Sequence, residues 1–235
     1  MMKHHSSYIT SDLLSNKSPT IHGFSKRILG DMRFAEKQKA FLDVLGIHTQ
    51  LFLVKQIHGD MVADPGDGYS EADAIVSGNK HGMAIGILVA DCVPIILSDT
   101  RGAAIGVVHA GWKGAVNHIV VKTVNRMCDV GAKREEIVAS IGPRIGSCCY
   151  SVPEDRAKIF QSSFGDDPRI CYSNLGTWYL DLGYVTMQLL MQAGITADRI
   201  DANPMCTSCQ TGSFYSYRKD SKETFGEQMA VICRI

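Results

Sequence analysis

The sequence lacks an excess of either charge, a long hydrophobic run and an export signal. Its 24 lysine and arginine residues balance 24 aspartate and glutamate residues, which argues against nucleic acid or a membrane as a partner attracted by bulk charge. The longest apolar run, residues 83–97, is interrupted by polar residues and is shorter than the ~20 residues of a membrane-spanning helix. No apolar stretch followed by small residues opens the chain, so we expect a cytoplasmic protein with small-molecule partners. Nothing in the sequence indicates its oligomeric state.

Several catalytic motifs are also missing. G-x-S-x-G, G-x-G-x-x-G and the Walker phosphate loop are absent, which removes the usual serine hydrolases, dinucleotide-binding enzymes and P-loop enzymes. None of the eight histidines forms an H-x-H pair, and multicopper centres need many imidazoles, so we exclude a multicopper oxidase. No H-x-E occurs, and PMCTSC has one residue too many for the P-C-x-x-C of zinc base deaminases, which excludes that family.

The chain is long enough for one domain with a sizeable core. We expect a flexible, polar N-terminus over residues 1–20 and a single domain over 21–235. Helices and strands are mixed without strict alternation, which favours an α+β fold. Apolar spacing predicts a helix with Phe34, Phe41, Leu42 and Leu45 on one stripe,. The predicted helices are 32–46, 114–128, one from Pro153 and 180–193, and predicted strands include 72–78 and 227–235.

The stretch from Ile87 to Trp112 organises the rest of the chain. It reads as two β-branched strands, 87–97 with Cys92 inside and 103–112 with His109 near its end, joined by a short turn,. A third apolar run, 51–59, ends at His58. Singly, each of these side chains is more often a packed core residue. Together, two histidines and one cysteine suit zinc and leave a fourth position for water or substrate, so we predict one catalytic metal site.

Polar residues near these segments are candidates for the surrounding site. Asp91 interrupts an apolar strand beside Cys92, so it must be paired or serve as a partner of a ligand or as a general base. The predicted helix after His109 offers free N–H groups near Lys113, a natural anion site. For Arg27 and Lys55 a surface charge is the commoner interpretation. The full set of candidates is Arg27, Lys55, Gln56, Asp73, Asp91 and Lys113.

The eight cysteines are expected to be reduced, because no export signal accompanies them,. Cys206 and Cys209 form a C-x-x-C, which is half of a structural zinc site or a redox pair. No second C-x-x-C completes it. A tight turn with packed thiols is therefore the favoured interpretation, both for this pair and for the neighbours Cys148 and Cys149.

Six motifs in order resemble one family. They are VKQIHGD (54–60), ADAIV (72–76), LVADCVPIIL (88–97), GVVHAGWKG (106–114), IGPRIGSCCY (141–150) and CTSCQTGSFYSYRKD (206–220). Over residues 21–230 the chain resembles the YfiH-type purine nucleoside phosphorylases, formerly called laccase-domain or polyphenol oxidase proteins. The resemblance implies an α+β, CNF1/YfiH-like fold with layered mixed β-sheets flanked by helices.

The resemblance also implies a function and a site. His58, Cys92 and His109 would bind zinc, with copper as the other candidate metal, and would be catalytic together with Asp91. Arg27, Lys55, Gln56, Asp73 and Lys113 would bind substrate. The implied reaction is phosphorolysis of adenosine, inosine, guanosine and methylthioadenosine, with adenosine deamination as a side activity.

The sequence departs from the family pattern in several places. ILGDM (28–32) stands where the family has a longer Gly-Gly-x-Ser loop, and TFGEQ (224–228) replaces a Thr-Gly-Arg. Ser151 stands where Glu is usual, and Thr186 where Asn is usual. Substrate preference is therefore less firmly implied than the metal site.

In the chemistry that we expect, phosphate binds at the helix start near Lys113 and Asp91 or Asp73 handles the proton. Two other functions stay open. One is a metal-free cysteine amidase with Cys92 as nucleophile and His109 as base. The other is a copper-binding or redox protein without turnover.

Overall fold

The computed structural model describes residues 1–67, 71–78 and 82–235. Two six-stranded β-sheets form its body. In spatial order, the first sheet contains β1 (Met2–His4), β2 (Tyr8–Ser11), β3 (Thr20–Ser25), β15 (Gln228–Arg234), β7 (Ala84–Val89) and β4 (Leu51–Phe52). The second contains β14 (Ile200–Ala202), β10 (Ile137–Ile141), β8 (Val93–Asp99), β9 (Ala104–Ala110), β6 (Ala74–Gly78) and β5 (Val62–Ala63).

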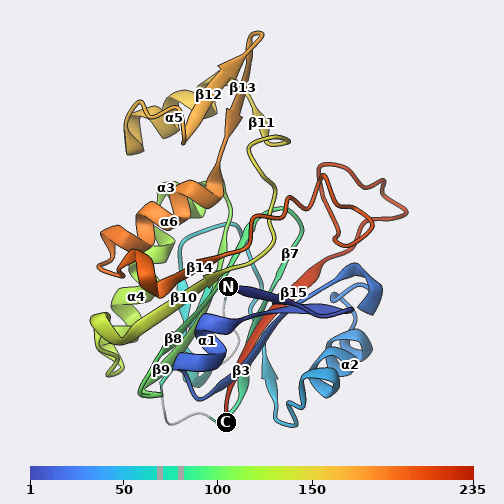
Figure 1. The fold of residues 1–235 in the computed structure, drawn as a ribbon, viewed down its shortest axis with the longest axis vertical. Helices are drawn as coiled ribbons and strands as arrows, with labels where there is room; N and C mark the ends of the chain where they lie inside the picture. The colour runs from blue at the N-terminus through green and yellow to red at the C-terminus, as the bar shows by residue number, and fades with distance from the viewer. Residues whose placement is uncertain (68–70, 79–81) are drawn as a thin grey trace.

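A third, small sheet and six α-helices complete the described regular structure, apart from short 3-10 turns. The small sheet contains β11 (Ser151–Val152), β13 (Thr177–Leu180) and β12 (Cys171–Asn174). The helices are α1 (Asp12–Lys17), α2 (Ala35–Leu45), α3 (Trp112–Val116), α4 (Ile119–Asp129), α5 (Glu154–Phe164) and α6 (Leu182–Gln192). Figure 1 shows the small sheet and α5 projecting from one end of the molecule.

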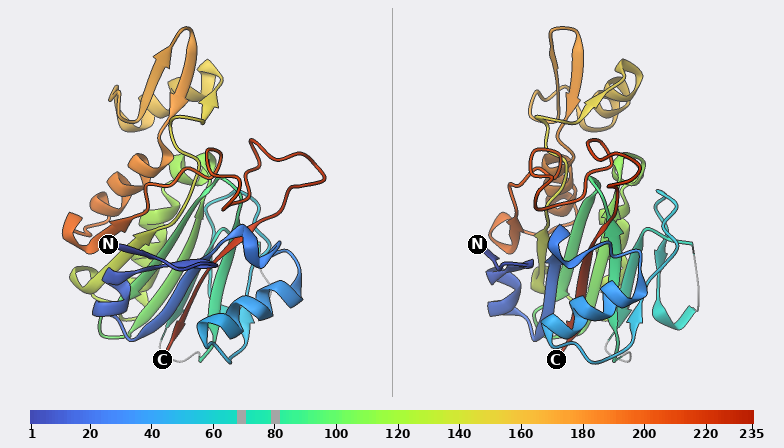
Figure 2. Two further views of the ribbon diagram at one scale, coloured as in Figure 1. Left: turned by 45° about the vertical axis from the view of Figure 1, so that its right-hand side comes forward. Right: turned by 90° about the vertical axis from the view of Figure 1, so that its right-hand side faces the viewer.

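The hydrophobic core is layered. Side chains of both large sheets, such as Ile87 and Ile232 from one and Ile96 and Val107 from the other, form one buried cluster between them. The outer face of the second sheet packs against α4 and α6, and the outer face of the first packs against α2. These helices lie on opposite sides of the sheets (Figures 1 and 2). The predicted α+β fold with layered sheets flanked by helices is confirmed.

The N-terminal segment is ordered, contrary to the predicted flexible N-terminus. Residues 1–20 form β1, β2 and α1, and Ser11 caps α1 by accepting a hydrogen bond from the Leu14 N–H. Ile9 and Leu14 are fully buried. Both residues are buried in the core between the sheets, and this burial, with the pairing of β1, β2 and β3, holds the segment in place.

The predicted helix at 32–46 begins later than expected. Phe34 precedes α2 and is 54 % exposed, so it does not belong to the buried stripe of Phe41 and Leu42. Gly46 ends the helix in the left-handed conformation, at φ 75°, as predicted for a C-terminal glycine. No helix among the described residues combines the length and apolar character needed to cross a membrane.

The organising stretch differs from its prediction in two ways. Residues 87–97 are not one strand, because the chain turns at Asp91, where φ is 83°, and β7 and β8 belong to different sheets. Cys92 therefore lies in the link between the two sheets. The predicted helix 114–128 is also interrupted: α3 and α4 are separated at His118, which has a left-handed φ of 58°.

Candidate metal centre and cavity

Two strand ends and a loop bring the predicted ligands together. Cys92 precedes β8, and His109 lies on β9 opposite Pro94, because β8 and β9 pair in antiparallel register. His58 follows β4 and adopts a left-handed φ of 58°. Ligand atoms of these three residues lie within 4.8 Å of one another. The two imidazole rings meet edge to face with 4.8 Å between their centroids.

Asp73 holds two of the three ligands in place. The carboxylate is fully buried and lies 2.7 Å from Nδ1 of His109, which leaves the other ring nitrogen to face Cys92 and His58. It also accepts hydrogen bonds from the backbone N–H groups of Ile57, His58 and Gly59. A carboxylate that orients a histidine in this way is the usual outer partner of a metal-binding imidazole. Asp73 thus positions His109 and the backbone around His58, and it is not one of the residues that line the cavity.

A glycine makes room for the ligands. A Cβ atom at Gly111 would lie 3.3 Å from Sγ of Cys92 and 3.5 Å from the His58 ring. Gly111 is the residue immediately before α3, so the chain can turn from β9 into the helix while passing close to the thiol. A side chain at Gly111 would therefore crowd the Cys92 sulfur, whereas one at Gly59, beside His58, would make only ordinary contacts.

The electrostatics of the cluster favour a thiolate. Burial alone raises the pKa of the Cys92 thiol, but attraction and hydrogen bonding to His109 and His58 outweigh it and lower the pKa to about 6. Burial likewise tends to lower the pKa of His109, and its interactions with Cys92 and Asp73 reverse that effect and raise it. The mutual charge stabilisation provides a deprotonated sulfur, the form that binds metals and acts as a nucleophile.

Hydrogen bonds of Asp91 join the wall of the site to the loop 207–218. Its carboxylate accepts hydrogen bonds from the hydroxyl of Thr207 at 2.5 Å, the hydroxyl of Ser216 at 3.0 Å and the backbone N–H of Arg218 at 2.7 Å. Its backbone carbonyl accepts from Ile145 N–H at 2.9 Å. These bonds account for a buried carboxylate inside an apolar stretch, and they tie residues 207–218 to the link that carries Cys92.

The other predicted site residues lie in different places. Gln56 lines the cavity, and its side-chain amide forms a pair of hydrogen bonds with the backbone of Leu88. The Lys55 ammonium pairs with Glu71 at the surface. The Lys113 ammonium lies 5.8 Å from the ring centre of Trp112. Neither lysine is part of the cavity wall.

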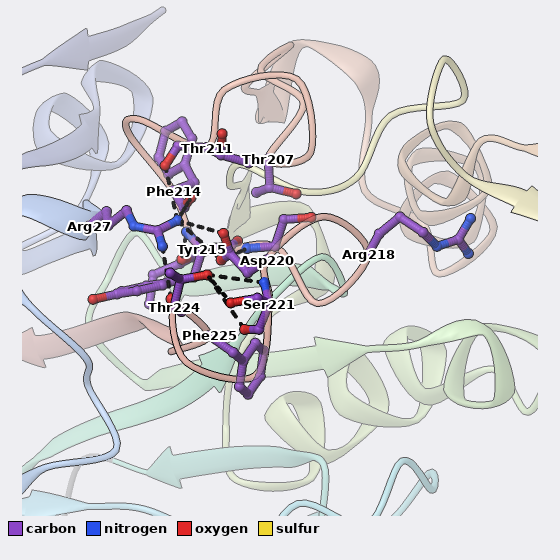
Figure 3. Close-up of polar contacts among 12 residues, drawn as sticks. Arg27, Thr207, Thr211, Phe214, Tyr215, Arg218, Asp220, Ser221, Thr224 and Phe225 are labelled. Carbon is purple, nitrogen blue, oxygen red and sulfur yellow. Dashed lines mark hydrogen bonds and ion pairs between the residues drawn. The ribbon is translucent and has the colours of Figure 1, made fainter.

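Arg27 supports a loop from outside the cavity wall. Its guanidinium donates to the carbonyl groups of Thr211, Phe214 and Thr224 and pairs with Asp220. Figure 3 shows these bonds gathered on one side of the loop, with the Arg218 side chain directed away from them. The structure thus brings Arg27 to the 211–224 loop, and not beside the His58, Cys92 and His109 cluster.

A cavity of about 640 Å³ opens beside the three ligands. This is within the size range of small-molecule sites. Besides the cluster, its wall contains two arginines, four aromatic residues and an acid that sequence reasoning missed: Arg156, Arg218, Trp112, Tyr150, Tyr217, Phe225 and Glu227. The aromatic run at 214–218 was the available signal for part of this wall. Arg156 and Glu227 gave none, because each is an ordinary charged residue until the fold places it.

Two charged residues of the wall have distinctive surroundings. The Arg156 guanidinium lies 4.4 Å over the Trp112 ring, and its Nε atom is buried without a hydrogen-bond partner among the described residues. Burial raises the pKa of Glu227, against the opposing influence of Arg33. The wall therefore contains a buried arginine nitrogen without a hydrogen-bond partner among the described residues and a carboxyl group that holds its proton more tightly than usual,.

The fold and the site define an α+β protein in which two His and one Cys converge between two sheets and face a cavity. A family model described as multi-copper polyphenol oxidoreductase laccase matches residues 31–235. The chain belongs to this family, which confirms the predicted resemblance. Only two histidines take part in the groups of potential metal ligands among the described residues, so those groups offer no multicopper set.

Named relatives are similar over most of the chain. A human protein named purine nucleoside phosphorylase LACC1 is 31% identical over 231 residues, 91% of this chain, and the chain spans 52% of that protein's length. A Corynebacterium glutamicum protein named purine nucleoside phosphorylase is 33% identical over 205 residues, 84% of this chain and 80% of that protein. A protein of an unknown prokaryote named adenosine deaminase RL5 is 34% identical over 149 residues, 63% of this chain and 56% of that protein.

Solved structures share the fold. Bacillus licheniformis YfiH superimposes with a TM-score of 0.86 at 24% identity, covering 100% of this chain and 99% of that one. YlmD from Geobacillus stearothermophilus gives a TM-score of 0.85 at 21% identity, with 99% and 98% covered. The predicted YfiH-like fold is confirmed.

Proposed function

We propose that the protein is a zinc-dependent purine nucleoside phosphorylase that acts on adenosine, inosine, guanosine and methylthioadenosine, with adenosine deamination as a second activity. The observation that carries this proposal is the cavity: it combines an open His58, Cys92 and His109 group with aromatic walls and a partnerless arginine nitrogen. The names of the relatives from Corynebacterium and the unknown prokaryote support the two activities.

The three donors fit zinc. Two imidazoles and a thiolate within 4.8 Å of one another match the three-ligand sets of catalytic zinc, which keep one position for water or substrate. The hydrogen bond between Asp73 and His109 supplies the outer support that such sites need. When bound, zinc supplies Lewis-acid polarisation of a substrate oxygen and lowers the pKa of water.

The remaining wall fits a purine nucleoside and phosphate. The rings of Trp112, Tyr150, Tyr217 and Phe225 line the cavity and supply aromatic surface for a purine,. One face of Trp112 is already covered by Arg156. Arg156 offers a guanidinium for phosphate, because its side chain lines the cavity,. Arg156 lies in the cavity wall, whereas Lys113 does not, so we place phosphate near Arg156.

Phosphorolysis requires a nucleophile at C1′ and a proton for the departing base. A phosphate oxygen held by Arg156 forms the new bond to C1′ while the bond from C1′ to N9 of the purine breaks. The electron pair of the broken bond goes to the purine. Glu227 donates a proton to this purine and then takes up the proton of the hydrogen phosphate that attacked C1′. Glu227 suits this role because its pKa is raised by burial,. Asp73 and Asp91 are already engaged by several donors, and we assign them to positioning.

Deamination needs the same cavity with water in place of phosphate. Water adds to C6 of adenine, and ammonia leaves, giving inosine. The aromatic walls that hold the purine would serve both reactions, since only the position of the nucleoside relative to the cluster changes. Phosphate should therefore compete with deamination wherever the two nucleophiles share space.

The direct test is incubation of adenosine or inosine with the purified chain, with and without phosphate. Ribose 1-phosphate and free base should form only with phosphate, and inosine and ammonia should form from adenosine without it. Absence of all these products from both nucleosides under both conditions would refute the proposal.

A matched pair of variants on α5 tests the phosphate position. Arg156→Gln should raise the KM for phosphate by roughly 10- to 100-fold, the value of a charge-assisted hydrogen bond. Lys158→Gln removes an exposed charge from the same helix that pairs with Glu154 and should leave the KM unchanged. Equal KM values for Arg156→Gln and wild type would place phosphate elsewhere.

One observation favours a second candidate. The lowered pKa of Cys92 and the raised pKa of His109 are also what a metal-free cysteine nucleophile with a histidine base requires. An amidase of this kind would hydrolyse amides in a metal-depleted state and would be inactivated by alkylation of Cys92. Zinc that is lost in Cys92→Ala, together with nucleoside turnover that depends on it, would exclude the amidase. A copper-loaded chain without turnover would instead support the redox protein.

A further inference from the structure

Four cysteines outside the cavity form a second cluster of soft metal donors. Cys148 and Cys149 lie in the loop between β10 and β11, and Cys206 and Cys209 lie in the turn after β14. Sequence reasoning treated each pair as packed thiols. The fold instead brings both pairs together, with all four Sγ atoms within 4.8 Å of one another.

We propose that Cys148, Cys149, Cys206 and Cys209 bind a second metal ion, a structural zinc in a tetrathiolate site. A zinc–sulfur bond of about 2.3 Å in a tetrahedron separates the sulfurs by roughly 3.8 Å. The sulfur of Cys148 lies 3.8 Å from that of Cys149 and 3.6 Å from that of Cys209, and Cys149 lies 3.3 Å from Cys209. These spacings exceed a disulfide bond of about 2.05 Å, and all four thiols are free.

The backbone beside the cluster favours a thiolate at Cys206. The Gly146 N–H donates to Sγ of Cys206 at 3.2 Å, a bond that favours the deprotonated sulfur,. A Cβ atom at Gly146 would lie 3.3 Å from Sγ of Cys148 and 3.3 Å from Cβ of Cys206. The glycine lets the two cysteine pairs approach without this slightly short contact. Four sulfurs and no oxygen ligand favour zinc over calcium, magnesium or manganese.

The position of the cluster gives the ion a structural role. Backbone hydrogen bonds already join its two segments, from Thr207 N–H to the Arg144 carbonyl at 3.0 Å. Thr207, within the C-x-x-C, donates to Asp91 next to Cys92. Tyr150, immediately after Cys149, lines the cavity. A zinc ion between these segments would fix one wall of the cavity, since four protein ligands leave no open position for substrate.

The test is a metal count on protein purified under reducing conditions. Wild type should contain two zinc ions per chain, one for each group of ligands. Cys206→Ser with Cys209→Ser should contain one. The control, Cys128→Ser with Cys233→Ser, removes two thiols that belong to neither group and should contain two. A wild-type count of one that the Cys206 and Cys209 double variant leaves unchanged would overturn the site.

A conservative variant separates metal binding from folding. Cys209 is exposed, and histidine replaces cysteine in Cys₃His zinc sites, so Cys209→His should keep the second zinc whereas Cys209→Ser should release it. Chelator should lower the Tm of wild type and Cys209→His by several degrees and change that of Cys209→Ser less. Disulfide-linked cysteines in the reduced preparation, or equal zinc in both variants, would refute the proposal. Because Cys92→Ala removes only the other zinc, failure of this site and failure of the proposed function give different counts.

Discussion

The two groups of potential ligands are built in opposite ways. His58, Cys92 and His109 come from three separate parts of the chain, which the ends of paired strands and the buried Asp73 hold together. The four cysteines come as two pairs from two loops, and Cys148 and Cys209 are exposed. The first group is held by the sheets and faces a cavity. The second is held mainly by loops, and its four sulfurs can surround an ion. Under our two proposals, the first group serves catalysis and the second supports the fold.

The largest effect is expected when one potential ligand is removed from the sheet-held group, which we define as His58, Cys92 and His109. Cys92→Ala should lower kcat/KM for phosphorolysis by about 10³-fold, the size of loss seen when one electrostatic stabiliser of a transition state is removed. It should release one zinc and leave the four-cysteine ion bound. Steady-state kinetics and elemental analysis check this, with Cys128→Ala as control. A Cys92→Ala variant with wild-type kcat/KM would contradict the assignment.

The stability of the sheets that hold the first group should depend on pH through one buried histidine. His22 on β3 is 2% exposed, and burial lowers its pKa to about 4, although a bond from the Ser11 N–H opposes this. In the unfolded chain this histidine takes up a proton near the ordinary histidine pKa of 6.5, so the folded state binds fewer protons between pH 6.5 and 4. Stability should therefore fall by about 3 kcal/mol as pH drops through this window.

Denaturant unfolding at pH 7 and pH 4 measures this effect. The pH dependence of His22→Gln, in which the amide oxygen can accept the bond from Ser11, should be flatter than that of wild type by most of this amount. His48→Gln, at an exposed position, should keep the wild-type slope. If the free energy of unfolding falls equally with pH in His22→Gln and wild type, His22 does not cause the loss of stability.

Weakening the support behind the ligands should have a smaller effect than removing a ligand. Asp73→Asn keeps the size of the side chain but loses the charge that orients His109 and accepts three backbone bonds. Zinc affinity of the first group should fall by about 10- to 100-fold. Competition with a chromophoric chelator measures the affinity. Asp60→Asn, in the same loop as His58, should leave it unchanged, and an equal loss in both variants would point to a general disturbance of the loop.

The smallest effect is expected when the glycine next to each group is replaced by alanine. Gly111→Ala places a methyl group 3.3 Å from the Cys92 sulfur, and Gly146→Ala places one 3.3 Å from the Cys148 sulfur. Because each contact is only slightly too short, the affected group should lose about 5-fold in zinc affinity. Each variant should affect its own group alone. Loss at both groups from either glycine would mean that the two sites are coupled.

Apolar, β-branched segments were sufficient to predict an α+β fold and to single out His58, Cys92 and His109, which the structure brings together. The layered sheets were implied by the family resemblance. Sequence reasoning misplaced Cys92 inside one strand, since the positive φ of Asp91 cannot be read from an apolar run. It also predicted a loose N-terminus, because the burial of Ile9 and Leu14 depends on a core cluster built from residues far along the chain. The positions of Arg156 and Glu227 and the meeting of the four cysteines depend on tertiary packing, which no local pattern encodes.

The central claim is that the sheet-held group is a catalytic zinc centre. It is tested most directly by following phosphate-dependent release of ribose 1-phosphate from adenosine as zinc is added back to the metal-depleted chain. We expect turnover to be abolished by depletion and to return with zinc in wild type, and not to return in Cys92→Ala. Full turnover in the depleted chain, or restored turnover in Cys92→Ala, would contradict the claim.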